Sequence, residues 1–209
     1  VLTVAVSTVA AEGPETLRKK AEAGDAHAQC RLGLTYVNVG GVPKDDAEAV
    51  KWFHKAAEQG DALAQASLGE MYANGEGVPK DAAEAVKWYR KAAEQGHAEA
   101  QFNLGRRYRN GWGVAEDYAE AVKWLRKAAE QGNAEAQFNL GDMYYLGRGV
   151  ARDAAEAAKW YRKAAEQGLA EAQFNLGLMY ERGEGIAQNH AEAGKGYRKA
   201  CRLNTTQAP

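Results

Sequence analysis

The sequence predicts an all-α protein built as a solenoid, in which one helical unit stacks on the next. The strongest observation is an internal period: the segment at 98–105, Ala-Glu-Ala-Gln-Phe-Asn-Leu-Gly, returns at 134–141 and 170–177. Looser copies occur at 62–69 and 26–33, and each copy begins 36 residues after the one before. A fixed period of this length is typical of stacked repeats, which bury their apolar faces against one another.

Each repeat carries the pattern of a first helix, named helix A, followed by a loop. In the second repeat, residues at helical spacing predict helix A from about Ala62 to Asn74. The segment that follows, 74–79, reads Asn-Gly-Glu-Gly-Val-Pro, and its glycines and proline predict a loop.

A capping box then predicts the start of a second helix, named helix B. In this box Asp81 accepts a hydrogen bond from a free N–H, and Glu84 reaches back to the cap residue. Helix B is expected from Ala82 to about Gln95, with a broad apolar face that includes Trp88. The same pair of residues recurs as Asp45/Glu48, Asp117/Glu120, Asp153/Glu156 and Asn189/Glu192.

The period predicts a solenoid over 25–198 with atypical ends. Residues 14–24 match the second half of a repeat and are expected to form a capping helix, and 199–209 are expected to form a polar tail. The last helix B carries Gly194 and Gly196 where other repeats have Val or Ala and Trp, which predicts a frayed or solvent-facing end. The repeat boundaries are placed at 19–54, 55–90, 91–126, 127–162 and 163–198.

Residues 1–13 are apolar and rich in small residues, and two interpretations remain open. Val9-Ala10-Ala11 suits a signal-peptidase site, so the segment is either the tail of a secretory signal or a lead segment of the folded protein. The first interpretation predicts a periplasmic or secreted protein, and the second leaves a cytoplasmic one.

Composition and spacing exclude several classes of function. The formal net charge is −1 without a basic stripe, so nucleic acid is not an expected partner. No apolar run approaches the roughly 20 residues of a membrane span. The four histidines stand at unlike repeat positions, and we expect no metal and no cofactor. Cys30 and Cys201 lie at opposite ends of the predicted stack, so both are interpreted as free thiols, with an intermolecular bridge as the alternative.

The repeat resembles known helical repeat families. Leu-Gly-x-x-Tyr in helix A resembles tetratricopeptide repeats, whereas the Asn-Gly-x-Gly-Val-x-x-Asp loop and the Ala-Val-Lys-Trp-Tyr-x-Lys-Ala-Ala-Glu-Gln-Gly segment are similar to Sel1-like repeats over Lys19–Arg198. The resemblance implies antiparallel helix pairs in a right-handed superhelix, with a concave groove lined by A helices. Members occur in the bacterial periplasm and secretions and in eukaryotic quality-control complexes. Repeat one departs from the loop pattern at Val39-Gly40-Gly41.

Positions of helix A that are not needed for stacking are the candidate binding residues, because matching positions of tetratricopeptide arrays face the groove. Phenylalanines would give an apolar floor, asparagines would pair with a ligand backbone, and Arg106 and Arg109 would hold a carboxylate. The alternative is that the phenylalanines pack between A helices and the asparagines bridge them. The predicted partner-binding residues are Phe102, Asn103, Arg106, Arg109, Trp112, Phe138, Asn139, Asp142, Tyr145, Phe174 and Asn175.

Trp112 stands in a Gly-rich loop and is either an exposed anchor or a ring folded onto the adjacent helix. We call the residues at one position of successive repeats a column. Two columns are expected to be structural. They are the glutamines Gln29, Gln65, Gln101, Gln137 and Gln173, and the tryptophans Trp52, Trp88, Trp124 and Trp160.

The sequence as a whole predicts a monomeric, non-catalytic scaffold or adaptor that binds a peptide or protein segment in its groove. The alternative is a cell-wall-related protein that binds peptidoglycan or a β-lactam, with little or no hydrolase activity. Ser67-Leu68-Gly69-Glu70 lacks the lysine of the Ser-x-x-Lys motif of penicillin-recognising enzymes, so no catalytic residue is expected.

Overall fold

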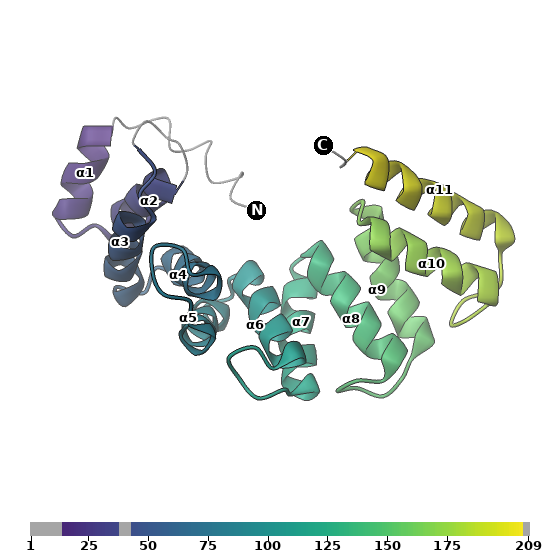
Figure 1. Cartoon of the computed structure of the whole chain (residues 1–209). Helices are drawn as coiled ribbons and strands as arrows, with labels where there is room; N and C mark the ends of the chain where they lie inside the picture. Colours follow the sequence, from purple (N-terminus) through teal and green to yellow (C-terminus); the bar gives the residue numbers. More distant parts are fainter. Residues whose placement is uncertain (1–13, 38–42, 207–209) are drawn as a thin grey trace. The chain divides into compact units, whose positions relative to one another are not determined.

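The computed structural model describes residues 14–37 and 43–206, and all regular structure in that part of the chain is α-helical (Figure 1). The all-α prediction is confirmed. The lead segment 1–13 and the Val39-Gly40-Gly41 loop lie outside the described residues. The helices are α1 (Pro14–Glu22), α2 (Ala26–Val37), α3 (Asp46–Glu58), α4 (Ala62–Asn74), α5 (Ala82–Glu94), α6 (Ala98–Asn110), α7 (Tyr118–Glu130), α8 (Ala134–Leu146), α9 (Ala154–Glu166), α10 (Ala170–Arg182) and α11 (His190–Thr206).

The chain divides inside α6 into two compact units, Val1–Ala100 and Gln101–Pro209. Helices α2, α4, α6, α8 and α10 are the predicted A helices, and α3, α5, α7, α9 and α11 are the B helices. In the first unit, α1 packs on α2, α2 on α3, α3 on α4 and α4 on α5. In the second unit, α7 packs on α8, α8 on α9, α9 on α10 and α10 on α11. Each unit is therefore a stack in which neighbours in sequence are neighbours in space.

The junction between helix A and helix B is fixed by one residue through two different groups. The side chain of Asp81 accepts from the N–H groups of Ala83 and Glu84 at 2.9 Å, which confirms the predicted cap. Its own N–H donates to the carbonyl of Tyr72 at 2.9 Å. Glu84 was predicted to accept from that N–H, and this was wrong, because the Tyr72 carbonyl holds it and Glu84 accepts from Lys87 instead.

The glutamine column is structural, as predicted. Nε2 of Gln65 donates to the carbonyl of Ala57 in the preceding helix B at 3.0 Å, and its Oε1 accepts from Gln95 at the end of its own helix B at 2.8 Å. Gln65 therefore connects three helices. The tryptophan column is also core, since Trp52, Trp88, Trp124 and Trp160 are only 5–7% exposed.

The two helices of a repeat approach most closely at the glycine of Leu-Gly. A Cβ built on Gly69 would lie 2.6 Å from the ring of Tyr89, and one on Gly141 would lie 2.8 Å from the ring of Tyr161. Gly33, Gly105 and Gly177 stand in the same way against Phe53, Leu125 and Tyr197. Glycine is needed here because any side chain would push helix B away.

The last helix is longer than predicted and is not frayed at its glycines. Helix α11 is continuous through Gly194 and Gly196 and runs to Thr206, beyond the predicted tail boundary at 198/199. Earlier B helices stop at a Gln-Gly pair whose glycine has a positive φ, as at Gly60. The corresponding residues 203 and 204 are Leu and Asn, so this stop signal is missing.

Two further expectations concern the whole chain. Cys30 is buried and Cys201 is exposed, and the two are not joined by a disulfide; the intermolecular alternative stays a prediction. Among the helices of the described part of the chain, none is both long and apolar enough to cross a membrane.

The close approach of the helices predicts the outcome of two matched substitutions. Gly141→Ala should lower the free energy of unfolding by about 1–3 kcal/mol, because the methyl group overlaps the Tyr161 ring. In Gly194→Ala the nearest atom is the flexible tip of Arg198 at 3.3 Å, so stability should rise by about 0.5–1 kcal/mol. Urea unfolding checks both, and equal effects of the two changes would contradict the packing argument.

The helix caps give a second prediction. Asn133 caps α8 through its side chain, whereas Leu169, at the same position before α10, has no side-chain cap bond. Leu169→Asp should therefore stabilise the protein by about 1 kcal/mol, reduced by the loss of a half-buried leucine. Asn133→Ala should destabilise it by a similar amount. Thermal unfolding measures both, and a destabilising Leu169→Asp would show that leucine packing outweighs capping.

Candidate functional site

A pocket of about 510 Å³ opens on the second unit between α6, the loop after it and α8. Three of the predicted site residues meet there: Arg109, Trp112 and Asp142. Trp112 and Leu146 are exposed by 46% and 52%, although both are large apolar side chains. The remaining lining residues are Asn110, Glu116, Tyr118, Met143 and Arg148.

Trp112 lies at the tip of the loop after α6 and is held there by its neighbours. Its backbone N–H donates to the carbonyl of Arg107 at 3.0 Å. The guanidinium groups of Arg106 and Arg107 lie 5.7 and 5.8 Å from the centre of its ring. The ring therefore has features of both alternatives, since it is 46% exposed and also lies against two arginine side chains of the adjacent helix α6. Its role as an anchor stays a prediction.

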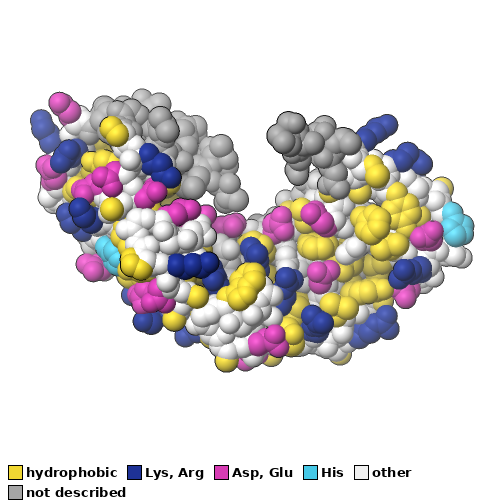
Figure 2. Space-filling view, in the orientation of Figure 1, with side chains coloured by type: hydrophobic (Ala, Val, Ile, Leu, Met, Phe, Trp, Pro, Cys, Tyr) yellow, Lys and Arg dark blue, Asp and Glu magenta, His cyan; other side chains and the backbone are white. Residues whose placement is uncertain are grey.

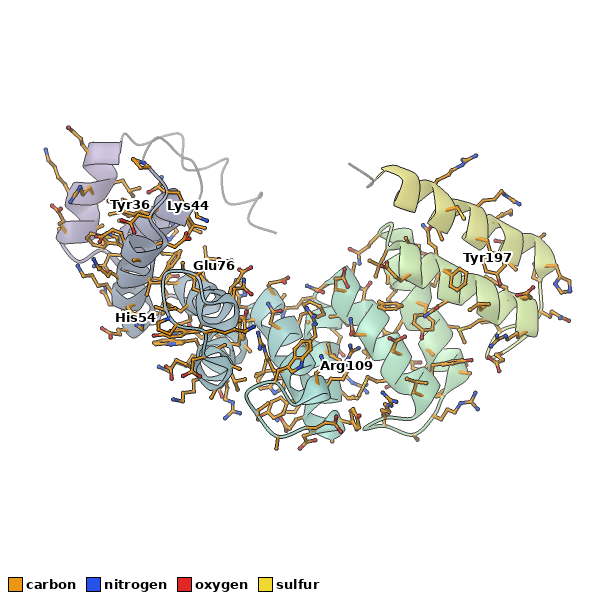
Figure 3. The ribbon with its side chains drawn as sticks, in the orientation of Figure 1. Tyr36, Lys44, His54, Glu76, Arg109 and Tyr197 are labelled. Carbon is orange, nitrogen blue, oxygen red and sulfur yellow. The ribbon has the colours of Figure 1, made fainter. Side chains whose placement is uncertain are left out.

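Arg109 connects α6 to α8, and Figure 3 shows it between these helices. Its Nη1 donates to Oδ1 of Asn139, and its Nε contacts Oδ1 of Asn110 at 3.4 Å. Asn139 is buried, and its Nδ2 donates to the carbonyl of Glu135 at 2.7 Å. Both ends of the Asn139 amide are thus engaged inside the protein. This placement matches the bridging alternative for that residue.

Asp142 belongs to a partly buried polar chain beneath the pocket. The hydroxyl of Tyr161 donates to Oδ1 of Asp142 at 2.7 Å, and Asn175 hydrogen-bonds the same hydroxyl. Burial raises the pKa of the Asp142 carboxyl, although Arg109 and Arg148 act in the opposite direction. Burial, followed by the charge of Asp142, likewise raises the pKa of Tyr161.

The three phenylalanines predicted to form an apolar floor differ in their exposure to solvent. Phe102 is buried, with the Arg106 guanidinium 5.5 Å from its ring centre. Phe138 is half-buried against the ring of Tyr161, and Phe174 is 47% exposed. Figure 2 shows hydrophobic side chains gathered over α8 and α10 in this unit. Apolar surface is therefore available beside α10 rather than beside Phe102.

The other predicted residues lie apart from the pocket or at its margin. Asn103 is half-buried on α6. The hydroxyl of Tyr145 donates to Glu184 at 2.7 Å, and the ring of Phe174 lies 5.5 Å from that of Tyr197. Tyr197 is seen in Figure 3 where α11 meets α10.

Sequence reasoning missed Leu146 and Arg148, which line the pocket. Both residues differ in type from those at the same position of other repeats, and this difference could have identified them in the sequence. Leu146 stands where the first three repeats have asparagine, as at Asn74 and Asn110. Arg148 stands where the second and fifth repeats have glutamate.

The histidines have structural contacts. His54 hydrogen-bonds the hydroxyl of Tyr72 at 3.1 Å, and Nδ1 of His97 accepts from the N–H of Ala100. Burial lowers the pKa of His97. Residues 14–37 and 43–206 hold no group of three His, Cys, Asp or Glu side chains placed to bind a metal ion.

The raised pKa of Asp142 predicts a pH dependence. Below the ordinary Asp pKa the carboxyl is protonated in both states. As pH rises, the unfolded chain ionises before the folded one, so the native protein loses stability until the folded pKa has been passed. Asp142→Asn keeps an oxygen acceptor for Tyr161 but carries no charge. Its free energy of unfolding relative to the wild type should therefore increase from about pH 3 to pH 7. Urea unfolding at the two pH values measures this, and a decrease would contradict it.

Comparison with known proteins identifies the repeat. A model of the Sel1 repeat matches five consecutive segments, 26–61, 62–97, 98–133, 134–169 and 170–205. Number and period agree with the prediction, but each matched segment begins seven residues later than the predicted boundary, at the start of a helix A. A search of curated proteins found no match.

Solved structures give the same answer. A protective antigen of uropathogenic Escherichia coli with an SLR fold is 49% identical, with a TM-score of 0.88 over 91% of this chain. The chain spans 41% of that protein's length. A Sel1 repeat protein from Oxalobacter formigenes is 40% identical, with a TM-score of 0.81, covering 86% of this chain and 74% of that one. A sel1 repeat protein from Klebsiella pneumoniae is 29% identical, with a TM-score of 0.59, covering 93% and 95%.

The matched repeats account for every described helix except α1, and they carry the caps, the glutamine ties and the buried tryptophans described above. This chain belongs to the Sel1 repeat family.

Proposed function

We propose that this protein is a non-catalytic scaffold that binds a segment of a partner protein in the pocket between α6 and α8. Sel1-repeat proteins are generally protein-interaction scaffolds. The observation that carries the proposal is the pocket of about 510 Å³ in which exposed Trp112 and Leu146 lie beside Arg109 and Arg148. Nothing in the described structure favours the cell-wall alternative.

The surroundings of Trp112 support a role as a binding anchor. Tryptophan is enriched among the few residues that dominate binding energy at interfaces. Its ring lies beside the guanidinium groups of Arg106 and Arg107, so less side-chain freedom is lost when a partner covers it. Leu146 offers a second apolar contact on the same pocket.

The charges around the pocket indicate what the partner should carry. Arg109 and Arg148 line the pocket together with Glu116 and Asp142, and Arg106 and Arg107 add positive charge around Trp112. The buried environment of Asp142 raises its pKa and so disfavours its negative form. A partner segment with an apolar side chain next to a carboxylate therefore complements the pocket.

The extent of the interface beyond the pocket is proposed from exposure. Phe174 is half-exposed, so a partner that continues toward α10 can cover it, whereas buried Phe102 supports the site from below. The roles of Asn103, Tyr145 and Asn175 in binding stay predictions. Export to the periplasm or the outside also stays a prediction, since it depends on residues 1–11.

A selection from a displayed library of random peptides tests the proposal. Peptides selected on the immobilised protein should combine an apolar residue with Asp or Glu. Trp112→Ala should weaken their binding by about thirtyfold, the effect of losing an anchor worth about 2 kcal/mol. Calorimetric titration measures the affinity. Arg148→Gln should weaken the binding of peptides that contain Asp or Glu, but not the binding of the same peptides with Asn or Gln at those positions.

Glu76→Ala is the matched control, because Glu76 occupies the loop position of Trp112 in the second repeat. It should leave peptide binding unchanged. Thermal unfolding shows whether each variant is folded. Unchanged affinity in a folded Trp112→Ala protein would refute the proposed site.

A further inference from the structure

The last repeat contains a second, smaller pocket. It has a volume of about 250 Å³ and lies between α9, α10 and α11. Its lining includes Ala165 on α9, Gln173, Leu176 and Tyr180 on α10, and Gly196 and Lys199 on α11. Four further charged side chains stand at the same pocket: Arg162, Glu166, Glu192 and Lys195. We name it the terminal pocket.

The terminal pocket occupies the place of a buried tryptophan in the other repeats. Four periods of 36 residues earlier, Ala165, Leu176 and Gly196 correspond to Ala21, Leu32 and Trp52. Ala21, Leu32 and Trp52 form one core cluster in the first repeat. The walls of the indole site are therefore kept in the last repeat, while the indole itself is replaced by a glycine.

Side-chain exposure shows the effect of this replacement. Ala21 and Leu32 are 1% and 4% exposed beneath Trp52. Their counterparts Ala165 and Leu176 are only half-buried. Apolar wall that a ring covers elsewhere is accessible to solvent here.

A cation is also in position for a ring. In the first repeat, Nζ of Lys55 lies 4.1 Å from the ring centre of Trp52. The lysine three residues after the tryptophan does the same at Lys91 and Lys163, at 4.0 and 4.1 Å. Lys199 stands three residues after Gly196 and lines the terminal pocket. The repeat keeps a lysine that elsewhere makes a cation–π contact.

The last repeat also lacks one of the side-chain hydrogen bonds that the other repeats form. Gln173 is 7% exposed, and its Oε1 accepts no hydrogen bond from the described residues. In the other repeats this oxygen accepts from a glutamine 30 residues later, as Gln137 does from Gln167. The corresponding position here is Leu203, which has no amide. The last repeat thus lacks both the ring and the amide that complete the others.

The chain does not fill the terminal pocket from Gly196 itself. A Cβ on Gly196 would lie 2.8 Å from the carbonyl oxygen of Gln173 and 3.3 Å from Cα of Gly177. Helix α11 therefore lies too close to α10 for a side chain at this position. A ring that enters the pocket has to come from elsewhere.

We propose that the terminal pocket binds the indole ring of a tryptophan on a partner protein. A closed cavity of about 150 Å³ holds benzene, so the volume of about 250 Å³ in this solvent-accessible pocket is large enough for the bigger indole ring. Ala165, Leu176 and Tyr180 supply the walls, and the ammonium of Lys199 covers the ring face. This site is separate from the pocket at Trp112, and its occupant completes the last repeat as Trp52 completes the first.

The test is a titration of the isotope-labelled chain with N-acetyl-tryptophanamide, followed by nuclear magnetic resonance. Saturable shifts should appear at the backbone amides of Leu176, Gly177 and Gly196. N-acetyl-leucinamide should give no saturable shift there. Absence of saturation with the tryptophan probe, or an equal response to the leucine probe, would overturn the proposal.

Two variants act on the pocket and one serves as a matched control. Lys199→Gln should weaken binding about two- to fivefold, and Ala165→Leu should abolish it by filling the space. Lys163→Gln removes the same kind of ammonium, but one that covers the chain's own Trp160, and should leave binding unchanged. Equal weakening by Lys163→Gln and Lys199→Gln in folded proteins would argue against the site.

A second copy of this chain is the competing occupant, because Trp112 is exposed. Sedimentation velocity distinguishes the two. A dimer that Trp112→Ala dissociates would overturn the proposal of a separate partner, whereas a monomer that still binds N-acetyl-tryptophanamide supports it.

Discussion

The contact on which each repeat depends is that between the glycine of Leu-Gly and a large side chain of helix B. With no Cβ on Gly69 or Gly141, the rings of Tyr89 and Tyr161 lie directly against the helix A backbone. This sets the separation of the two helices. The cap at Asp81 and the tie at Gln65 have fixed reach, so both require that separation. A bulkier residue at the glycine would disturb all three contacts together.

The polar groups close each repeat without ligands. The cap residue satisfies N–H groups at the start of helix B and donates its own N–H to helix A. In the first four repeats a glutamine of helix A accepts a hydrogen bond from the glutamine at the end of its own helix B, and Gln65, for example, also donates to the preceding helix B. These bonds need fixed residue types, so they recur in most repeats, the exceptions being Leu169, which gives α10 no side-chain cap bond, and Gln173, whose Oε1 has no hydrogen-bond donor among the described residues. A repeat position whose residue type varies is therefore not needed for these structural hydrogen bonds. Variation between repeats consequently indicates functional residues better than identity does.

The repeat made most of the fold readable from the sequence, and it explains what stayed hidden. Caps, glutamines and buried tryptophans follow from spacing alone. The hydrogen bond from the Asp81 N–H to the carbonyl of Tyr72 could not be predicted from spacing, because Glu84 was an equally good acceptor in the local sequence pattern. The spacing predicted which residues lie on the face of helix A that is not needed for stacking. It could not show that Asn139 accepts a hydrogen bond from Arg109 inside the protein, or that Phe174 stays exposed. Side-chain partners on a neighbouring helix decide this.

Both candidate binding sites arise where the period is broken by one side chain. At Trp112 the loop gains a ring for which the repeat has no cavity, so the ring stays at the surface. At Gly196 the last repeat loses the ring, α11 lies close against α10 at that residue, and a pocket of about 250 Å³ remains beside it. In the first case the exposed ring lines a pocket beside α8, and in the second the missing ring leaves apolar side chains of the last repeat accessible. The pocket beside Trp112 therefore suits an apolar side chain next to a carboxylate, whereas the terminal pocket suits an aromatic ring, so the two sites are complementary to different partner surfaces.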